Sequence, residues 1–171
     1  MGSARAEALA HIDQLYDSKT LIFSDLSFDP TYGEVLAERF GPDRVIGVKI
    51  SNSGDGTNLD LMRVKNGALR IYTVGRSYLL DLLLRELHNG KVRIRDRQDS
   101  RRAYEQLSAL EMDYRQTGVV YQCPSGHHDD LAISCAILVW AALHPHLETW
   151  IRIFEPRTVQ KRPSSGWGAH V

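Results

Sequence analysis

The chain has 171 residues, of which 43% are hydrophobic and 25% charged, a composition typical of a single soluble globular domain. Its 21 Lys and Arg residues balance 21 Asp and Glu residues, so no overall basic charge points to nucleic acid and any basic surface must be local. Its two cysteines exclude a disulfide framework. We expect neither a secretion signal nor a membrane-spanning segment, and hence a cytoplasmic location without a membrane partner.

The first half of the chain alternates between helical and strand patterns. Helices are predicted over residues 4–16 and 32–40, and strands over residues 20–24 and 44–51. The pair Asn66-Gly67, between residues 61–65 and 68–73, indicates a hairpin whose two central positions need positive φ.

The second half continues this alternation. The patterns predict helices over residues 77–88, 101–116 and 129–143, and strands over residues 91–96 and 119–123. The helix over residues 129–143 is apolar almost all round and should be buried. Strands separated by helices favour an α/β fold with a mixed sheet. We expect one domain over residues 1–150 and a tail over residues 151–171.

A polar loop leads from the predicted strand 119–123 to the buried helix. It reads Gly126-His127-His128-Asp129-Asp130-Leu131. Acids at a helix N-terminus can simply cap free amides and complement the helix dipole, which contributes about 0.3–1 kcal/mol. The setting also places Asp129 and Asp130 at the edge of the sheet, where they can serve a site. We expect His127 and His128 to support the loop, or to orient a phosphate or a metal-bound water.

Asp25 ends the first predicted strand. The carboxyl ends of strands are where α/β folds build their sites, although an Asp here can also form a turn in Asp25-Leu26-Ser27-Phe28-Asp29-Pro30, with Ser24 or Asp29 alongside. Together, Asp25 and Asp129 suggest carboxylates that converge on Mg²⁺ or Mn²⁺, because such hard cations prefer oxygen ligands. Two ions about 3.5–4 Å apart can activate water for phosphodiester hydrolysis.

A zinc site is the alternative metal centre. Its potential ligands are Cys123, His127, His128 and Cys135. The chain lacks a Cys-x-x-Cys pair, and a cysteine inside a buried helix is commonly a small apolar residue. We therefore expect no zinc.

Basic residues are concentrated around the predicted strand 91–96. The candidate DNA-binding residues are Lys91, Arg93, Arg95, Arg97, Arg101 and Arg102. On a strand, alternate side chains point to one face, so the basic residues would face solvent while Val92 and Ile94 turn inward. Such a face can bind DNA phosphates without sequence preference, or it can simply protect a sheet edge.

One segment resembles a known family. It reads Tyr121-Gln122-Cys123-Pro124-Ser125-Gly126-His127-His128-Asp129-Asp130-Leu131-Ala132 and runs into an apolar helix with Trp140. This segment resembles the last motif of the nuclease domain of phage DNA-packaging terminase large subunits. The order of the upstream elements is also similar, so the resemblance covers residues 6–143, although only the final motif is specific.

The resemblance implies a ribonuclease H-like fold, with a mixed sheet flanked by helices, and a hydrolase that cleaves double-stranded DNA with Mg²⁺ or Mn²⁺ during genome packaging. Asp129 matches the last metal-binding carboxylate, Asp130 is its neighbour, and Asp25 matches the middle acid. These three residues are the expected catalytic residues, with Asp25 and Asp129 as metal ligands. The implied partners are DNA, a terminase ATPase domain and other packaging-motor subunits, in the cytoplasm of the bacterial host of a phage or prophage.

The chain also departs from this family. Family members usually begin with antiparallel strands, the first of which carries another catalytic Asp. The residues before Asp25 are instead typical of a helix, so we expect the usual first strands to be lacking. Leu26-Ser27-Phe28 replaces a glycine-rich stretch, and no Gly-x-x-x-x-Gly-Lys-[Ser/Thr] phosphate loop is present. A fragment, a chain that has lost catalysis and a partner that supplies the missing acid all explain this, and we favour the fragment.

Two rival functions remain open. A catalytically incomplete ribonuclease H-like domain could act as a DNA-binding or assembly module, and the missing acid favours it. A resolvase or transposase relative would instead prefer branched DNA. Divalent-metal binding separates the first rival from an active nuclease, because a dead site should lose its metal affinity before its fold.

Overall fold

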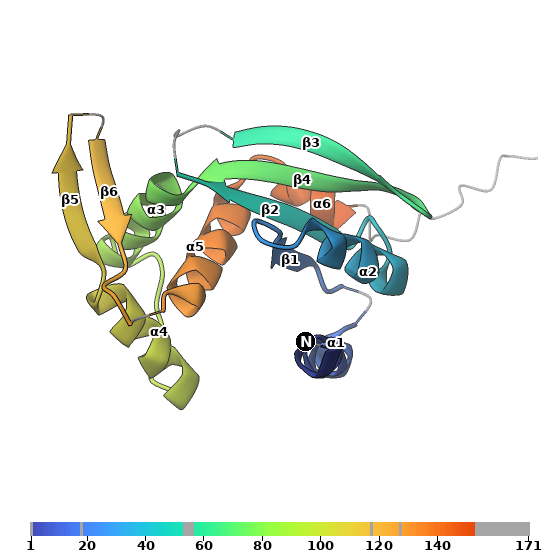
Figure 1. Ribbon diagram of the computed structural model, residues 1–171, viewed down its shortest axis with the longest axis horizontal. Helices are drawn as coiled ribbons and strands as arrows, with labels where there is room; N and C mark the ends of the chain where they lie inside the picture. Colours follow the sequence, from blue (N-terminus) through green and yellow to red (C-terminus); the bar gives the residue numbers. More distant parts are fainter. Residues whose placement is uncertain (1, 18, 53–56, 117, 127, 153–171) are drawn as a thin grey trace, which may run out of the picture.

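The computed structural model describes residues 2–17, 19–52, 57–116, 118–126 and 128–152, which form a mixed four-stranded sheet, a two-stranded hairpin and flanking helices (Figure 1). The first half contributes α1 (Gly2–Leu15), β1 (Ile22–Asp25), α2 (Pro30–Phe40), β2 (Val45–Ser51), β3 (Thr57–Val64) and β4 (Gly67–Gly75). The second half contributes α3 (Arg76–His88), α4 (Gln98–Ser108), β5 (Glu111–Arg115), β6 (Gly118–Gln122), α5 (Asp130–Leu143) and α6 (Leu147–Arg152). The prediction of an α/β fold with a mixed sheet is confirmed.

The strands of the larger sheet lie in the order β1-β2-β4-β3. Strands β1, β2 and β4 are parallel, whereas β3 runs antiparallel to β4. Asp25 at the end of β1 pairs with Val48 of β2, and Ser51 at the end of β2 pairs with Gly75 of β4. The three parallel strands therefore end along the same edge of the sheet, and the residues that follow them emerge there.

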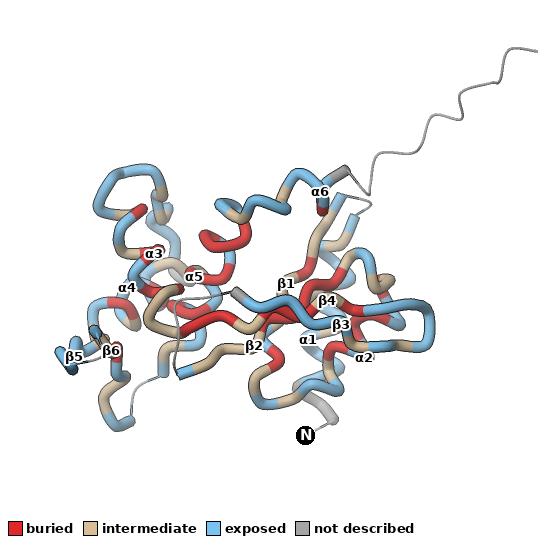
Figure 2. The backbone as a smooth tube through the Cα atoms, turned by 90° about the horizontal axis from the view of Figure 1, so that it is seen from above, coloured by how far each residue is buried: buried red, intermediate tan, exposed pale blue. Residues whose placement is uncertain are grey.

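Two hydrophobic clusters lie on opposite faces of this sheet. Because side chains alternate along a strand, Val45 of β2 packs in the cluster with Leu36 of α2, whereas Ile46 and Val48 pack in the cluster that contains Trp140 of α5. Figure 2 shows buried backbone along β2, β4 and α5, while β3 and the β5–β6 hairpin are largely exposed. The sheet is thus covered on both faces, as in other α/β folds.

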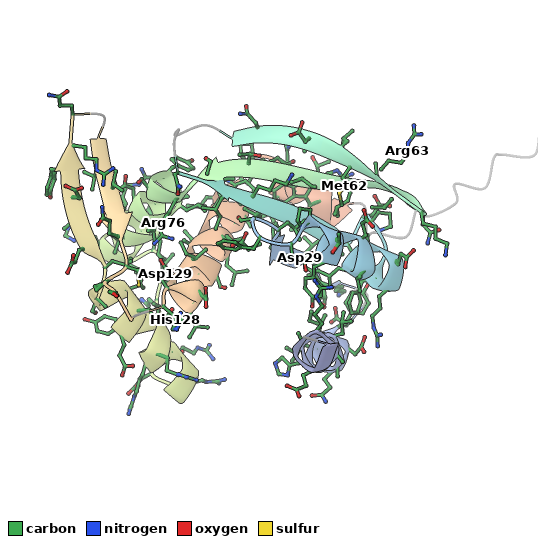
Figure 3. The ribbon with its side chains drawn as sticks, in the orientation of Figure 1. Asp29, Met62, Arg63, Arg76, His128 and Asp129 are labelled. Carbon is green, nitrogen blue, oxygen red and sulfur yellow. The ribbon has the colours of Figure 1, made fainter. Side chains whose placement is uncertain are left out.

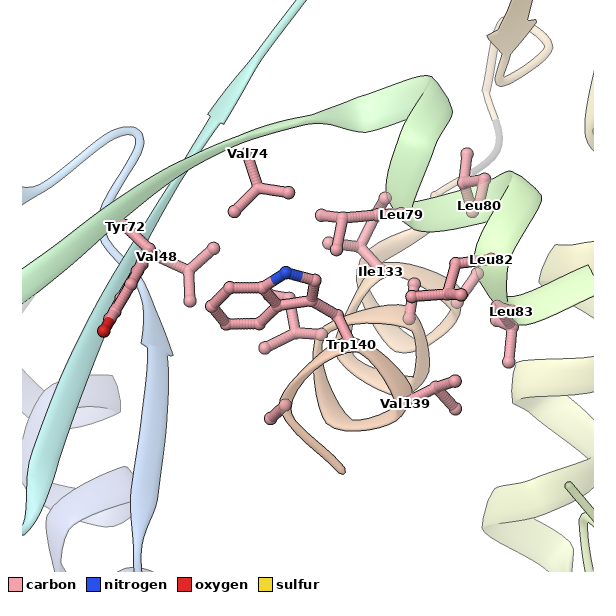
Figure 4. Close-up of a cluster of buried hydrophobic side chains, with 14 of the residues drawn as sticks. Val48, Tyr72, Val74, Leu79, Leu80, Leu82, Leu83, Ile133, Val139 and Trp140 are labelled. Atoms are coloured by element: carbon pink, nitrogen blue, oxygen red, sulfur yellow. The ribbon is translucent and has the colours of Figure 1, made fainter. Parts of the chain in front are cut away.

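Helix α5 is the central helix of the larger cluster. Trp140 is 2% exposed and lies with its ring 5.4 Å from the ring of Tyr72 (Figure 4). Trp150 of α6 is also 2% exposed and stacks on His144, which follows α5. The prediction that the apolar helix and Trp140 belong to the core is confirmed, and Trp150 joins them there.

The predicted strand over residues 91–96 is wrong. This segment is irregular, because the amides of Lys91 and Val92 donate to the carbonyl oxygen of Glu86 and turn the chain back onto the end of α3. Val92 and Ile94 nevertheless pack against the core, while the basic side chains are exposed. Apolar residues that point inward thus alternate with basic residues that point outward, although the segment pairs with no strand among the described residues.

The predicted helix over residues 101–116 is too long. Helix α4 ends at Ser108, and Glu111–Arg115 instead forms β5, which pairs antiparallel with β6. Gly118, with a φ of 120°, lies where the hairpin reverses direction. Pairing with β6 provides backbone hydrogen bonds for this polar segment. The spacing of residues along a helix does not reveal such a strand partner.

The hairpin predicted at Asn66-Gly67 forms, but its turn is one residue earlier. Val64 pairs with Gly67, so Lys65 and Asn66 occupy the turn. Gly67 has a φ of 143°, and among the described residues no non-glycine residue has a positive φ. The glycine therefore supplies the unusual backbone conformation alone.

No helix within the described residues is long and apolar enough to cross a membrane. Helix α6 extends to Arg152, beyond the domain end predicted at residue 150. Most of the predicted tail, residues 153–171, lies outside the described residues.

Candidate functional site

A cavity of about 350 Å³ lies at the carboxyl edge of the parallel strands. Its lining residues are Asp25, Ser27, Phe28, Ile50, Asn52, Arg76, Asp129, Asp130, Ile133 and Ser134. The structure therefore brings together the three acids predicted from the sequence, Asp25 from the end of β1 and Asp129 and Asp130 from the start of α5. Asn52 follows β2 and Arg76 follows β4, so each of the three parallel strands delivers a polar residue to the cavity.

The sequence left open whether Asp25 forms a turn or belongs to a site, and in the structure it forms a turn and also lines the cavity. Its Oδ1 accepts hydrogen bonds from the backbone amide of Ser27, at 2.8 Å, and from the Ser27 hydroxyl. The same hydroxyl oxygen accepts a hydrogen bond from the amide of Ile50 at 2.8 Å. The turn is thus tied to β2, and this fixes the place where the Asp25 carboxylate enters the cavity.

Leu26 anchors this turn from the opposite side. The side chain is fully buried, and the Leu26 amide donates to the carbonyl oxygen of Val48 at 2.7 Å. A Cβ atom on Gly47 would lie 2.5 Å from Leu26 Cδ1, and one on Gly33 would lie 2.7 Å from it. The leucine therefore fills the space that these two glycines leave, and it holds the neighbouring Asp25 against the sheet.

The carboxylate of Asp129 does not cap α5. The amides of Leu131 and Ala132 donate to Oε1 of Gln106 in α4, at 2.8 and 3.2 Å. Within the described residues, the Asp129 side chain makes no capping hydrogen bond. The simple capping interpretation is therefore wrong for Asp129. Because α4 supplies the cap, the carboxylate can face the cavity.

Arg76, the first residue of α3, forms an ion pair with Asp129 (Figure 3). Its Nε also donates to the carbonyl oxygen of Tyr121 at 3.4 Å. The Arg76 and Asp129 side chains are 22% and 18% exposed, so solvent screens this pair less than a surface pair. Arg76 is not among the site residues predicted from the sequence. Its position after a strand parallel to β1 is the signal that could have revealed it.

The donor chemistry of the cavity suits Mg²⁺ or Mn²⁺. Asp25, Asp129 and Asp130 offer hard carboxylate oxygens, and Asp25 and Asp130 are exposed, so that a bound ion could keep several waters. Across the described part of the chain, however, no group of three or more His, Cys, Asp or Glu side chains is close enough to hold a metal ion. A divalent ion at Asp129 would have to share this carboxylate with Arg76 or displace the arginine.

Cys123, His128 and Cys135, the described residues among those considered for zinc, belong to no group that could hold a metal ion. Burial raises the pKa of the Cys123 thiol and of the Cys135 thiol, and Cys135 packs against the core. A raised pKa opposes formation of the thiolate, which is the form that binds metal. His128 is exposed and does not line the cavity, whereas His127 lies outside the described residues.

The candidate DNA-binding residues lie before and along the first half of α4, and all six are exposed. Lys91 Nζ is 3.6 Å from Glu86 Oε2, and Arg101 Nε is 2.7 Å from Asp96 Oδ1. The four that make no ion pair with another described side chain are Arg93, Arg95, Arg97 and Arg102. Helix α4 thus carries basic residues near its start and, near its end, the glutamine that caps α5.

Compared with models of protein families, with curated proteins and with solved structures, the chain has no match. The cavity offers three carboxylates and one guanidinium, and an exposed basic segment precedes and enters α4, the helix that caps α5. Such a combination suits a phosphate-containing substrate together with a divalent cation.

Proposed function

We propose that this chain is a metal-dependent endonuclease domain that cleaves double-stranded DNA, with a ribonuclease H-like fold similar to that of phage terminase large subunits. One observation carries the proposal: Asp25 at the end of β1 lines the same cavity as Asp129 and Asp130 at the start of α5, although Asp25 is far from both in the sequence. Acids that converge at the carboxyl edge of a sheet are typical of an α/β active site.

In this proposal the carboxylates of Asp25 and Asp129 hold Mg²⁺ or Mn²⁺, and Asp130 supports them. A bound divalent ion would supply an activated water and neutralise charge on the phosphodiester. Leu26 and Ser27 orient the Asp25 carboxylate, while Gln106 leaves the Asp129 carboxylate available to the cavity.

The basic segment would bind the DNA backbone. Arg93 and Arg95, which precede α4, and Arg102, which lies within it, are exposed, so they can contact phosphates without reading bases. As part of a terminase, the domain would act beside an ATPase domain and other packaging-motor subunits, in the cytoplasm of a bacterial host. These partners and this location belong to the proposal.

A second candidate function is a catalytically incomplete domain that binds DNA or assembles with a motor. It is favoured by the pairing of Asp129 with Arg76 and by the lack of a three-ligand metal group among the described side chains. A domain of this kind would keep its basic surface and its fold but would bind divalent metal poorly.

Plasmid cleavage in Mn²⁺ tests the proposal. The wild-type chain should nick and linearise supercoiled DNA, and chelator, Asp25→Asn or Asp129→Asn should each abolish this. Asp60→Asn is the matched control, because Asp60 lies on β3 and outside the cavity lining. Circular dichroism would confirm that every variant is folded. A folded wild-type chain that cleaves nothing in Mn²⁺ would rule out an active nuclease and leave the second candidate.

A further inference from the structure

The ion pair between Arg76 and Asp129 differs from the surface ion pairs of the molecule. Its side chains are 22% and 18% exposed, whereas those of Arg101 and Asp96 are 70% and 74% exposed. Both Arg76 and Asp129 line the cavity that also contains Asp25. The charge of the guanidinium is therefore placed among the carboxylates proposed to hold metal, where water screens it only partly.

The position of Arg76 is unfavourable for α3 itself. The residue begins this helix, and the N-terminus is the positive end of the helix dipole, where a cation is destabilising. Asp129 and the carbonyl oxygen of Tyr121 compensate, because both accept from the guanidinium. Contacts outside α3 thus hold the arginine in place, and one of these contacts, Asp129, lines the cavity.

From this arrangement we infer that Arg76 is an internal cation that competes with a divalent metal ion for Asp129, an inference that rests on the proposed function. A carboxylate oxygen paired with a guanidinium is a poorer metal ligand, and a positive charge in the cavity repels a dication. Arg76 therefore weakens metal binding and neutralises the Asp129 carboxylate while the metal is absent.

Calorimetric titration of the chain with Mn²⁺ measures this competition. Arg76→Gln should bind Mn²⁺ about fivefold more tightly than the wild type, or better, which is the lower range for coupled sites. Arg76→Lys keeps the charge and should stay close to the wild type. Arg63→Gln removes the same charge from β3, away from the cavity, and should leave the affinity unchanged (Figure 3). Introducing Asp129→Asn into the Arg76→Gln variant should remove its gain in affinity for Mn²⁺.

Titration of the wild-type chain with Mg²⁺ provides a second readout, in which a variant serves only to assign the signal. The ¹⁵N NMR signal of Arg76 Nε, assigned by its disappearance in Arg76→Lys, should shift as Mg²⁺ saturates the site. An unshifted signal at saturation, or an Arg76→Gln variant that binds Mn²⁺ no better than the wild type, would overturn the competition. The proposed nuclease would survive either result, provided that the wild type binds metal. If neither wild type nor Arg76→Gln binds Mn²⁺, both proposals fail.

Discussion

Gln106 of α4 accepts a hydrogen bond from the amide of Leu131, at the start of α5, across 2.8 Å. The same oxygen accepts from the amide of Ala132. Unsatisfied amides at a helix N-terminus are usually capped by the residue that precedes the helix, which here is Asp129. Capping by another helix leaves the Asp129 carboxylate for Arg76 and for the cavity.

Gln106→Leu should destabilise the fold by about 1 kcal/mol, the usual effect of losing a helix cap. Gln106→Glu keeps an acceptor oxygen at the same place, so its free energy of unfolding should fall by less. Urea denaturation followed by circular dichroism measures both free energies of unfolding. Equal stabilities of the two variants would show that the acceptor at this position does not contribute to the fold.

Gly47→Ala should lower the free energy of unfolding by about 1–3 kcal/mol, because the added methyl group overpacks a filled site. It would collide with Leu26 Cδ1, at 2.5 Å, and approach Ile71 Cγ1, at 3.2 Å. In a Leu26→Ala background the same methyl group would enter vacated space, so its effect should shrink or change sign. Chemical denaturation of the four proteins completes the cycle, and additive effects would exclude this packing relationship.

Stability should fall as the pH drops below about 6.5, the ordinary pKa of histidine. Burial lowers the pKa of His144 below this value, and the charge on His146 lowers it further. His144 Nδ1 also accepts from the backbone amide of His146 at 3.1 Å, which requires an unprotonated nitrogen. The unfolded chain therefore binds the proton more readily, and stability is lost as the pH falls from 6.5 toward the folded-state pKa.

Thermal unfolding between pH 7.5 and 5 measures this dependence. His144→Gln cannot take up the proton and should flatten the slope of melting temperature against pH over this range. His144 lines a second cavity, separate from the candidate site, together with two titratable residues of α3, Tyr78 and Arg85. A slope that is the same in His144→Gln would assign the acid sensitivity to other groups.

Replacing a basic residue before or within α4 should weaken DNA binding equally for all sequences. For each phosphate that the variant no longer neutralises, the slope of log K against log salt concentration should fall by about 0.9. Fluorescence anisotropy with a short duplex, at several salt concentrations, compares Arg93→Ala and Arg102→Ala with Arg63→Ala on β3. Slopes that do not differ between these variants would place the DNA elsewhere.

The acidic residues of the candidate site could be predicted because local patterns locate them. Asp25 ends a short apolar run, and Asp129 and Asp130 stand before a long apolar helix, so strand ends and helix starts follow from spacing alone. Arg76 and Gln106 could not be assigned in this way. Each acts on a residue of another element, and the contact depends on how three elements pack together.

The segment before α4 shows the limit of periodicity. Val92 and Ile94 alternate with basic residues as they would on a strand, and they do point inward, yet hydrogen bonds to Glu86 hold the segment in an irregular path. A strand also needs a neighbouring strand to pair with, and the alternation of apolar and basic residues does not show whether such a neighbour exists. The exposure of the basic residues was therefore predictable, whereas their backbone conformation was not.

The contact of Leu26 with Gly33 and Gly47 has a consequence for genetics. A search for loss-of-function alleles would be expected to return these three apolar positions alongside the acids, although none of them carries a reactive atom. Such alleles would leave the charge of the protein and its exposed face unchanged. They would act by moving Asp25, and a suppressor would be a second change in volume at one of the same three positions.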